Sequence, residues 1–224
     1  MMTKFEIQVP KEHYYNNYDS VRRFISYYYQ VMLVQELLKF KEDNVLEIGI
    51  GNKTTYNYLK QQGINIDGCD FDKDLEPDYV GDIRNLPFNN NSYQVILVSE
   101  VLEHITWGDV YIAIRELHRI SNRYVIISIP YSSACFDLLF RFPLINRLLG
   151  KQYLSLFVRV PYFFLPFNFN GEHYWEMGRK NYSIGRVRET FNQYFNIIKE
   201  VRPVLNDYHY FFVLEKIHPK DINI

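Results

Sequence analysis

The sequence predicts an α/β fold in which strands alternate with helices around one doubly wound, mostly parallel seven-stranded sheet. Three observations carry this prediction. Short β-branched or apolar runs alternate with segments of helical periodicity from residue 44 onward. Several of these runs are continuously apolar, as expected for strands that are covered on both faces. A glycine-rich turn directly follows the first run.

The first element is an amphipathic helix over residues 19–40. Apolar side chains recur there at spacings of three and four, and Asp19 or Ser20 can cap its start. We expect this helix to pack on the sheet, while three tyrosines before it, Tyr14, Tyr15 and Tyr18, can reach the mouth of a ligand site. The predicted apolar face comprises Val21, Phe24, Ile25, Tyr28, Val31, Met32 and Leu38.

Strands and helices then alternate up to residue 130. Gly63 follows the first helix of this region in the favoured C-cap role. Thr106 and Asp109 form an S/T-x-x-D capping pattern that opens the second helix. The predicted strands are residues 45–48, 64–69, 79–80, 94–98 and 124–129, and the predicted helices are 54–62 and the segment after 106.

The alternation breaks after Pro130 and resumes near residue 183. A helix over 183–194 precedes two strands, 195–201 and 208–216, whose short connection predicts an antiparallel edge. We therefore expect a single domain over residues 1–224. Its parts are an N-terminal helical arm (1–43), a cofactor-binding half (44–130), an insert or cap (131–182), and a C-terminal helix with edge strands (183–217).

Composition narrows the class of protein. The formal net charge is −1, so no global basic field indicates a nucleic-acid partner. Cys69 and Cys135 are the two cysteines, which fits a reducing compartment. The first 30 residues contain no continuous apolar segment of the secretory type, so we expect a cytoplasmic protein.

The run NVLEIGIGNKT, residues 44–54, is the most informative segment. A β-branched run ends near Glu47, and Gly49 and Gly51 follow at alternate positions before a helix. Such a turn needs backbone freedom, and a ligand lying against the main chain needs the side chains to be absent. By itself the pattern also fits a tight strand-to-helix turn in an α/β protein without a ligand.

Two acidic residues extend the pattern. Asp70 follows the second strand, at about the spacing from the glycine loop at which a carboxylate reaches a ribose diol. Asp82 follows the third strand. This order predicts a nucleoside-containing cofactor held across the ends of parallel strands.

Two further blocks complete the series: GDIRNLPF at residues 81–88 and YQVILVSEVLEHI at 93–105. With the glycine loop and Asp70, they resemble class I S-adenosylmethionine-dependent methyltransferases, in particular the type 11 methyltransferases, over roughly residues 44–130. The resemblance implies a Rossmann-like fold, S-adenosyl-L-methionine as cofactor and methyl transfer as the activity.

The resemblance also implies roles around the methionine part of the cofactor. Gly49 and Gly51 would line it, and Glu47 would orient the loop and the cofactor amino group. Ser99 and Glu100, at the end of the fourth strand, would lie near the transferable methyl group.

On the nucleoside side, the resemblance implies that Asp70 holds the ribose and Phe71 lies beside the adenine. Asp82 would accept a hydrogen bond from the adenine amino group, and the main chain of Ile83 would meet the ring edge. Taken singly, Asp82 fits a helix cap equally well, and Ile83 is simply apolar.

One position departs from the family pattern. Lys53 stands where many members have a third glycine, and Thr54 occupies the sixth position of a G-x-G-x-x-G reading. A pyrophosphate needs close backbone approach over that stretch, whereas S-adenosylmethionine has no phosphate. The departure therefore disfavours NAD.

The acceptor chemistry points to two histidines. His173, within GEHYWE at residues 171–176, is the stronger candidate for a base, and His104 in the VLEHI segment is the other. Either histidine also fits a structural role in a loop. Glu172, His173 and Glu176 have no second cluster to complete a metal shell, so we expect no metal site.

These residues predict methyl transfer to a small-molecule, glycan-type or lipid-type acceptor. A non-catalytic S-adenosylmethionine-binding scaffold or sensor remains the alternative. Aminopropyl transfer and NAD-dependent chemistry fit the motif series less well. A nucleic-acid or protein acceptor is disfavoured, because there is no basic stripe and SEVL stands where an NPPY-type tetrapeptide would follow the fourth strand.

The aromatic-rich insert, residues 131–170, leaves three interpretations open. It can cover the sheet edge as ordinary core, or close as a lid over a hydrophobic or sugar-bearing substrate. It can also make peripheral membrane contact, because basic residues flank its apolar positions. Charges and prolines interrupt every window long enough to span a membrane. The flanking basic residues are Arg141, Arg147, Lys151 and Arg159.

Overall fold

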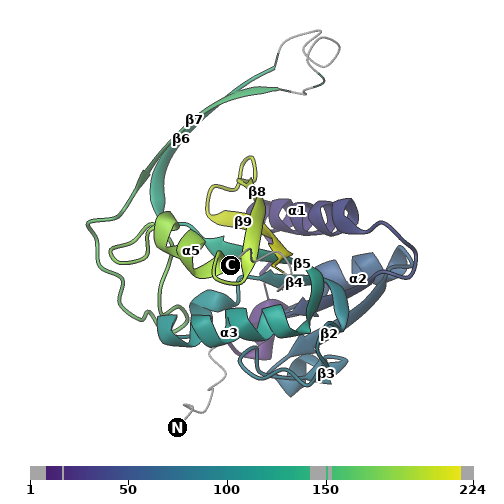
Figure 1. Cartoon of the computed structure of the whole chain (residues 1–224). Helices are drawn as coiled ribbons and strands as arrows, with labels where there is room; N and C mark the ends of the chain where they lie inside the picture. Colours follow the sequence, from purple (N-terminus) through teal and green to yellow (C-terminus); the bar gives the residue numbers. More distant parts are fainter. Residues whose placement is uncertain (1–8, 17, 142–149, 151–152, 218–224) are drawn as a thin grey trace.

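The computed structural model of the chain (Figure 1) describes residues 9–16, 18–141, 150 and 153–217. A seven-stranded sheet with the order β3-β2-β1-β4-β5-β9-β8 forms its centre. The strands are β1 (Asn44–Ile48), β2 (Asn65–Asp70), β3 (Tyr79–Val80), β4 (Tyr93–Ser99), β5 (Ser121–Pro130), β8 (Phe195–Val201) and β9 (His209–Lys216). The predicted doubly wound α/β fold, with its antiparallel pairing at one edge, is confirmed.

Strand direction follows the predicted pattern. Strands β1 to β5 pair in parallel, and β9 runs antiparallel to both β5 and the edge strand β8. Parallel strands bring their carboxyl ends to one edge of the sheet. The loops after β1, β2 and β4 therefore meet there.

Helices cover both faces of the sheet. They are α1 (Val21–Leu37), α2 (Thr54–Gln61), α3 (Trp107–Ile120) and α5 (Ile184–Phe191), with 3-10 turns η1 (Lys11–Tyr14), η2 (Lys73–Leu75) and η3 (Leu102–His104). Side chains of α1 and α2 pack in one core with alternate residues of the central strands. Side chains of α3 and α5 pack in a second core on the opposite face.

The helix ends follow the predicted capping chemistry. The Ser20 hydroxyl accepts a hydrogen bond from the Arg23 main-chain N–H at the start of α1. The Thr106 hydroxyl accepts one from the Asp109 N–H at the start of α3. Gly63 follows α2 with φ of +77°, where a side chain would be strained.

The buried face of α1 differs in part from the predicted one: Val31, Met32 and Leu38 pack against the core, and others do not. Val21, Phe24 and Tyr28 are 77%, 57% and 63% exposed. The buried residues are Ser26, Gln30, Leu33 and Val34. Apolar residues occur on more than one side of this helix, so periodicity alone does not identify the side that meets the sheet. The polar residues are buried because they bond to partners: the Thr55 hydroxyl donates to Gln30 Oε1 at 2.5 Å.

The insert forms a hairpin that projects from the body (Figure 1). Strands β6 (Ser133–Phe140) and β7 (Leu154–Pro161) pair only with each other, as a two-stranded antiparallel sheet. We call these two strands the arm. Arg147 and Lys151, two of the predicted basic residues, lie outside the described residues.

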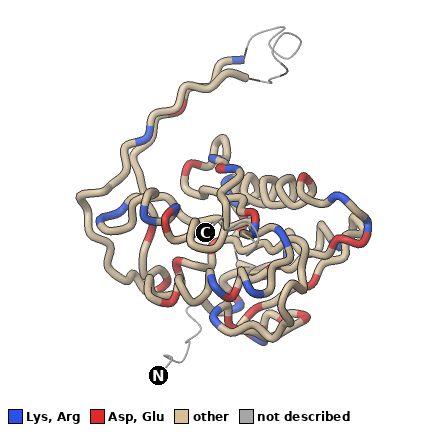
Figure 2. The backbone as a smooth tube through the Cα atoms, in the orientation of Figure 1, with Lys and Arg blue, Asp and Glu red and all other residues tan. Residues whose placement is uncertain are grey.

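The arm presents one apolar face to solvent. Its exposed members alternate along the strands: Phe136, Leu138, Phe140, Leu154, Leu156, Val158 and Val160. Figure 2 shows few charged residues along it. Part of the other face meets the body, where Arg202 pairs with Asp137 at 3.0 Å and Arg159 donates to the Asp207 carbonyl at 2.6 Å, whereas Leu139 on that face is exposed. None of the described helices is long and apolar enough to span a membrane.

Candidate active site

A single pocket at the carboxyl ends of β1, β2 and β4 contains every residue for which the sequence predicts a site role. The predicted cofactor residues there are Glu47, Gly49, Gly51, Asp70, Phe71, Asp82, Ile83, Ser99 and Glu100. His104 and His173 line the same pocket. No described residue of the arm lines it.

The glycine loop after β1 depends on missing side chains. Gly49 has φ of +81°, and a Cβ placed there would lie 2.4 Å from Cγ2 of Val101. Gly51 has φ of +46°, and a Cβ there would meet the Tyr14 ring at 3.4 Å. Both positions therefore favour glycine, and the main chain of the loop is open to a ligand.

Lys53 does not close the site. Its φ of +60° is left-handed, a conformation that favours glycine. Its Nζ donates to the Glu76 carbonyl at 2.7 Å, and the residue is not part of the pocket wall. The Lys53 side chain, which departs from the family pattern, therefore does not obstruct the pocket.

Two buried acceptors on the methionine side lack partners among the described residues. Glu47 Oε2 and Ser99 Oγ are buried without a hydrogen bond. Burial, and secondarily the charge of Asp70, raises the pKa of Glu47 to about 8. A positively charged amino group at this position would satisfy the carboxylate and restore its ionised form. The pocket fits S-adenosylmethionine in this respect.

Asp70 ties the ends of β1 and β2 together. Its Oδ2 accepts from the Ile50 N–H and its Oδ1 from the Asp72 N–H, each at 3.0 Å. Burial raises its pKa, while these main-chain donors oppose the shift. Each carboxylate oxygen has a second lone pair, so the group can still accept from two ribose hydroxyls.

Asp82 is engaged by a neighbouring arginine. Nε and Nη2 of Arg84 donate to its carboxylate, the latter at 2.8 Å, and Nη1 of Arg84 contacts Asp109 at 3.2 Å. Phe71 is 40% exposed and Ile83 is buried at the pocket wall. These residues line the pocket, as the predicted nucleoside side requires.

Glu100, which was predicted as a site residue, contacts His209, a wall residue that was not predicted. Glu100 has φ of +54°; its Oε1 accepts from the Ser128 hydroxyl at 2.7 Å, and its Oε2 lies 3.7 Å from His209 Nε2. His209 is in β9, far from the motifs in sequence, so spacing carries no signal for it. Tyr14 and Tyr18, considered for the mouth of the site, do line the pocket, whereas Tyr15 does not.

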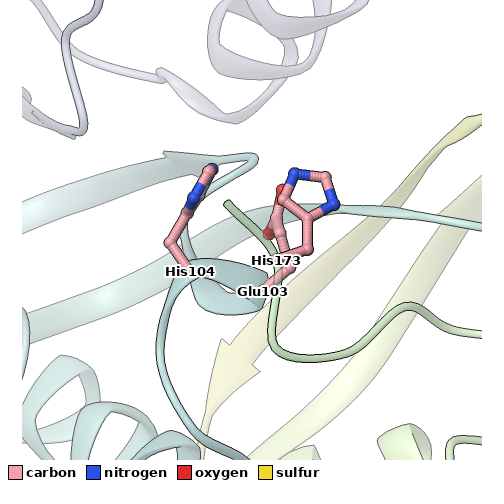
Figure 3. A group of neighbouring side chains, drawn as sticks. All are labelled: Glu103, His104 and His173. Carbon is pink, nitrogen blue, oxygen red and sulfur yellow. The ribbon is translucent and has the colours of Figure 1, made fainter. Parts of the chain in front are cut away.

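His104 and His173 come together from η3 and from the segment before Met177 (Figure 3). Their rings meet edge to face with centroids 4.9 Å apart. His104 Nδ1 lies 3.1 Å from the Glu172 carbonyl oxygen, and His173 Nδ1 lies 3.1 Å from Glu176 Oε1. Burial, reinforced by His173, lowers the pKa of His104 to about 4, so it is neutral at pH 7.

Glu103 precedes His104 in η3 and lies close to both histidines. It is fully buried, and neither of its carboxylate oxygens has a hydrogen-bond partner among the described residues. Burial, and secondarily the charge of Glu100, raises its pKa well above the usual value. Such a group gives no sequence signal beyond its place beside His104.

Main-chain contacts position this end of the pocket. The Tyr174 N–H donates to the Glu103 carbonyl at 2.8 Å, and Trp175 Nε1 donates to the Leu102 carbonyl at 3.1 Å. Trp175 is 1% exposed and anchors the segment in the core. The pocket therefore has a backbone-lined end suited to a nucleoside cofactor and an imidazole-lined end suited to a second reactant.

Comparison with known proteins supports this interpretation. Residues 46–129 match the methyltransferase domain family. No curated protein matches the sequence. The S-adenosylmethionine-dependent methyltransferase of Clostridium acetobutylicum is similar in structure, with a TM-score of 0.55 and 10% identity over 89% of this chain and 93% of that one.

Two similar structures contain S-adenosylhomocysteine. The 1,6-didemethyltoxoflavin-N1-methyltransferase of Burkholderia thailandensis, which also binds 1,6-didemethyltoxoflavin, has a TM-score of 0.57 and 12% identity over 92% of this chain and 85% of that one. The magnesium protoporphyrin IX methyltransferase of Synechocystis has a TM-score of 0.53 and 13% identity over 88% of this chain and 83% of that one. The family match over residues 46–129, the sheet order and the pocket together support a class I S-adenosylmethionine-dependent methyltransferase.

Proposed function

We propose that the protein transfers the methyl group of S-adenosylmethionine to a small-molecule acceptor, a class in which we include glycan-type and lipid-type compounds. The observation that supports this proposal is that the glycine loop, His104 and His173 line one pocket. Two structurally similar enzymes are named for methyl transfer to compounds of low molecular mass, a toxoflavin precursor and a porphyrin. The net charge of −1 gives no support for a nucleic-acid acceptor.

The proposed roles divide along the pocket. The methionine part lies against Glu47, Gly49, Gly51, Ser99 and Glu100. The nucleoside part lies against Asp70, Phe71, Asp82 and Ile83. The acceptor lies between the sulfonium and the two histidines, where binding brings the reacting atoms into line.

His173 is the better placed of the two histidines to assist proton removal. Its Nδ1 faces Glu176, so in the neutral ring Nδ1 donates and Nε2 carries the lone pair. The low pKa of His104 makes it a weak proton acceptor near neutral pH. Its proposed part is to contact the acceptor beside His173.

Calorimetric titration with S-adenosylmethionine, S-adenosylhomocysteine and NAD tests the cofactor assignment. We expect micromolar binding of the two sulfur nucleosides, no binding of NAD, and loss of binding in Asp70→Ala. Asp74→Ala, which removes an exposed carboxylate outside the pocket wall, is the matched control. Absence of binding by both sulfur nucleosides would contradict the proposed function.

We further propose that the arm makes peripheral contact with an anionic membrane surface, and that the protein acts in the cytoplasm. An apolar strip with a basic end suits insertion into the headgroup region. The strip is exposed, and Arg141 follows it directly in an exposed position. Both cysteines are unpaired thiols, which agrees with a reducing compartment.

Co-sedimentation with vesicles tests the membrane contact. We expect binding to anionic phosphatidylserine vesicles, weaker binding to neutral phosphatidylcholine vesicles, and loss of binding in Phe136→Asp/Leu156→Asp. Ser155→Asp, on the opposite face of the arm, adds a charge without interrupting the strip and is the control. Self-association without vesicle binding would show that the strip is a contact between copies, and would overturn this proposal.

A further inference from the structure

We infer that Glu103, His104 and His173 form a binding site for a divalent transition-metal ion such as Zn²⁺ or Fe²⁺ at the acceptor end of the pocket. The ion would bind an oxygen of the acceptor, which makes the acceptor a hydroxyl compound. This inference rests on the proposed function only for the statement that the methyl acceptor binds to the ion. The metal site itself stands on the three side chains.

The first observation is the ligand set. One potential ligand atom from each residue lies within 4.8 Å of those of the other two (Figure 3). Ligand atoms around a tetrahedral zinc ion lie about 3.3 Å apart, given bonds of about 2.0 Å. Small side-chain rotations would therefore close the group on an ion. Two imidazoles and one carboxylate suit Zn²⁺ and Fe²⁺ in sites that keep an open position.

The second observation is the unsatisfied carboxyl group. Glu103 is 0% exposed, and both of its oxygens lack a hydrogen-bond partner in the described part of the chain. A buried carboxyl group without partners is costly, and side chains of this kind are normally paired or bound to a metal. A cation between Glu103 and the histidines supplies the missing partner.

The third observation is how the histidine rings are held. Each presents Nδ1 to an acceptor 3.1 Å away: the Glu172 carbonyl for His104 and Glu176 Oε1 for His173. A metal-binding histidine characteristically donates its other ring N–H to a carbonyl or carboxylate, which fixes the tautomer and aims Nε2 at the metal. Both Nδ1 atoms meet an acceptor of this kind.

Glu176 is itself held in place. Its Oε1 also accepts from the Tyr208 hydroxyl at 2.7 Å, and its Oε2 accepts from the Ser132 hydroxyl. The carboxylate that orients His173 is therefore fixed from three sides. Outer contacts of this kind support metal sites in which the ligands must not reorient.

The sequence predicts no metal site, because Glu172, His173 and Glu176 lack a second cluster. The fold brings that second cluster to His173 as Glu103 and His104, and assigns Glu176 an outer role. The titration below decides between the prediction and the inference.

Three protein ligands leave a coordination position for the acceptor, in the same pocket as the methyl donor. With His173 Nε2 on the metal, the ion would take over the part proposed above for that imidazole: the bound hydroxyl would lose its proton to water more readily. An electron pair of the resulting oxygen anion then forms the O–C bond to the methyl carbon. The S–C bond breaks, and its electron pair returns to sulfur, which becomes the thioether of S-adenosylhomocysteine.

Metal titration of the full chain, purified without a polyhistidine tag and treated with a chelator, tests the site. We expect one equivalent of Zn²⁺ to bind by calorimetry, and Co²⁺ to give the visible absorption of a low-coordinate complex. Glu103→Gln and His173→Ala should each weaken Zn²⁺ binding at least about 10- to 100-fold. Glu172→Gln, which keeps the carbonyl facing His104, should bind Zn²⁺ as the wild type does.

The controls separate this inference from the proposed function. S-adenosylhomocysteine is titrated into the same samples, and its binding by both variants reports an intact fold. No stoichiometric Zn²⁺ binding, or equal binding by Glu103→Gln, Glu172→Gln and the wild type, would overturn the metal site. S-adenosylhomocysteine binding that persists in that case would leave the proposed function standing. Zn²⁺ binding without binding of either sulfur nucleoside would support the metal site and contradict the proposed function.

Discussion

The two ends of the pocket are built differently. The cofactor end consists largely of main chain and strand ends, contributed by β1, β2 and β4 through loops that are close in sequence. The acceptor end consists of side chains from η3 and from the segment around Trp175, which is 73 residues from its hydrogen-bond partner Leu102. Site residues at strand ends can be predicted from sequence motifs, whereas a site formed by packing of distant segments cannot.

The largest expected effect separates the two ends by function. His173→Ala removes the imidazole at the acceptor end, and we expect turnover to fall about 100- to 10,000-fold. The dissociation constant for S-adenosylmethionine should stay within about twofold, because the cofactor residues are untouched. Steady-state kinetics and calorimetry measure the two quantities. His118→Ala, a histidine outside the pocket wall, is the control. An equal loss of turnover and affinity, or no loss of either, would contradict the assignment of His173 to the acceptor end.

The next effect comes from the cofactor end. Gly49→Ala places a methyl group 2.4 Å from Val101 at a residue with φ of +81°. Strain and overpacking together cost about 2–4 kcal/mol, so affinity for S-adenosylmethionine should fall roughly 30- to 1000-fold. Gly63→Ala is the matched control, because its φ is +77° but no atom lies within 4 Å of the added Cβ. Unchanged affinity in Gly49→Ala would show that the loop is not in contact with the cofactor.

The third effect is a pH dependence at the cofactor end. The pKa of Glu47 is about 8 in the folded protein, against 4.5 as its ordinary value. Between these values the folded protein retains a proton that the unfolded chain has lost. The free energy of unfolding therefore falls with rising pH, by about 1.4 kcal/mol per pH unit from this group.

Cofactor binding reverses that shift. A positively charged amino group favours the ionised carboxylate, so binding releases the proton and affinity rises with pH towards about 8. We expect a gain of up to about tenfold per pH unit, measured by calorimetry between about pH 6 and 8. Glu47→Gln should show a flat profile. A steep profile retained in Glu47→Gln would assign the titration to another group.

The smallest effect tests whether a loss of stability alone can lower turnover or cofactor affinity. Thr106→Ala removes the cap of α3, in which the hydroxyl accepts from the Asp109 N–H at 3.3 Å. We expect the free energy of unfolding to fall by about 1 kcal/mol in denaturant titrations. Cofactor affinity and turnover should not change. A parallel loss of either would mean that global stability contributes to the larger effects.

The predictable part of the molecule is that governed by local rules. The strand series, the caps at Ser20 and Thr106, and the glycine loop follow from periodicity, capping chemistry and backbone freedom, and the fold confirms them. Every predicted site residue lies in one pocket, although their individual roles remain predictions.

The rest depends on tertiary contacts that no local pattern encodes. The predicted buried side of α1 was wrong at Val21, Phe24 and Tyr28, because apolar residues lie on several sides of that helix and the polar Ser26 and Gln30 find partners inside. Glu103 and His209 entered the pocket through packing of η3 and β9. The arm itself was not predicted: the aromatic segment was open to interpretation as core, lid or membrane contact, and β6 and β7 pair with each other and not with the main sheet.

The base of the arm has a consequence for how such enzymes diversify. Ser133 lies opposite Pro161, so the chain leaves the body and returns to it through one pair of neighbouring residues. An excursion that begins and ends at the same place can lengthen, shorten or change its surface while both anchor points stay fixed. The length and surface of the arm can then change during evolution while the pocket, which no described residue of the arm lines, stays the same.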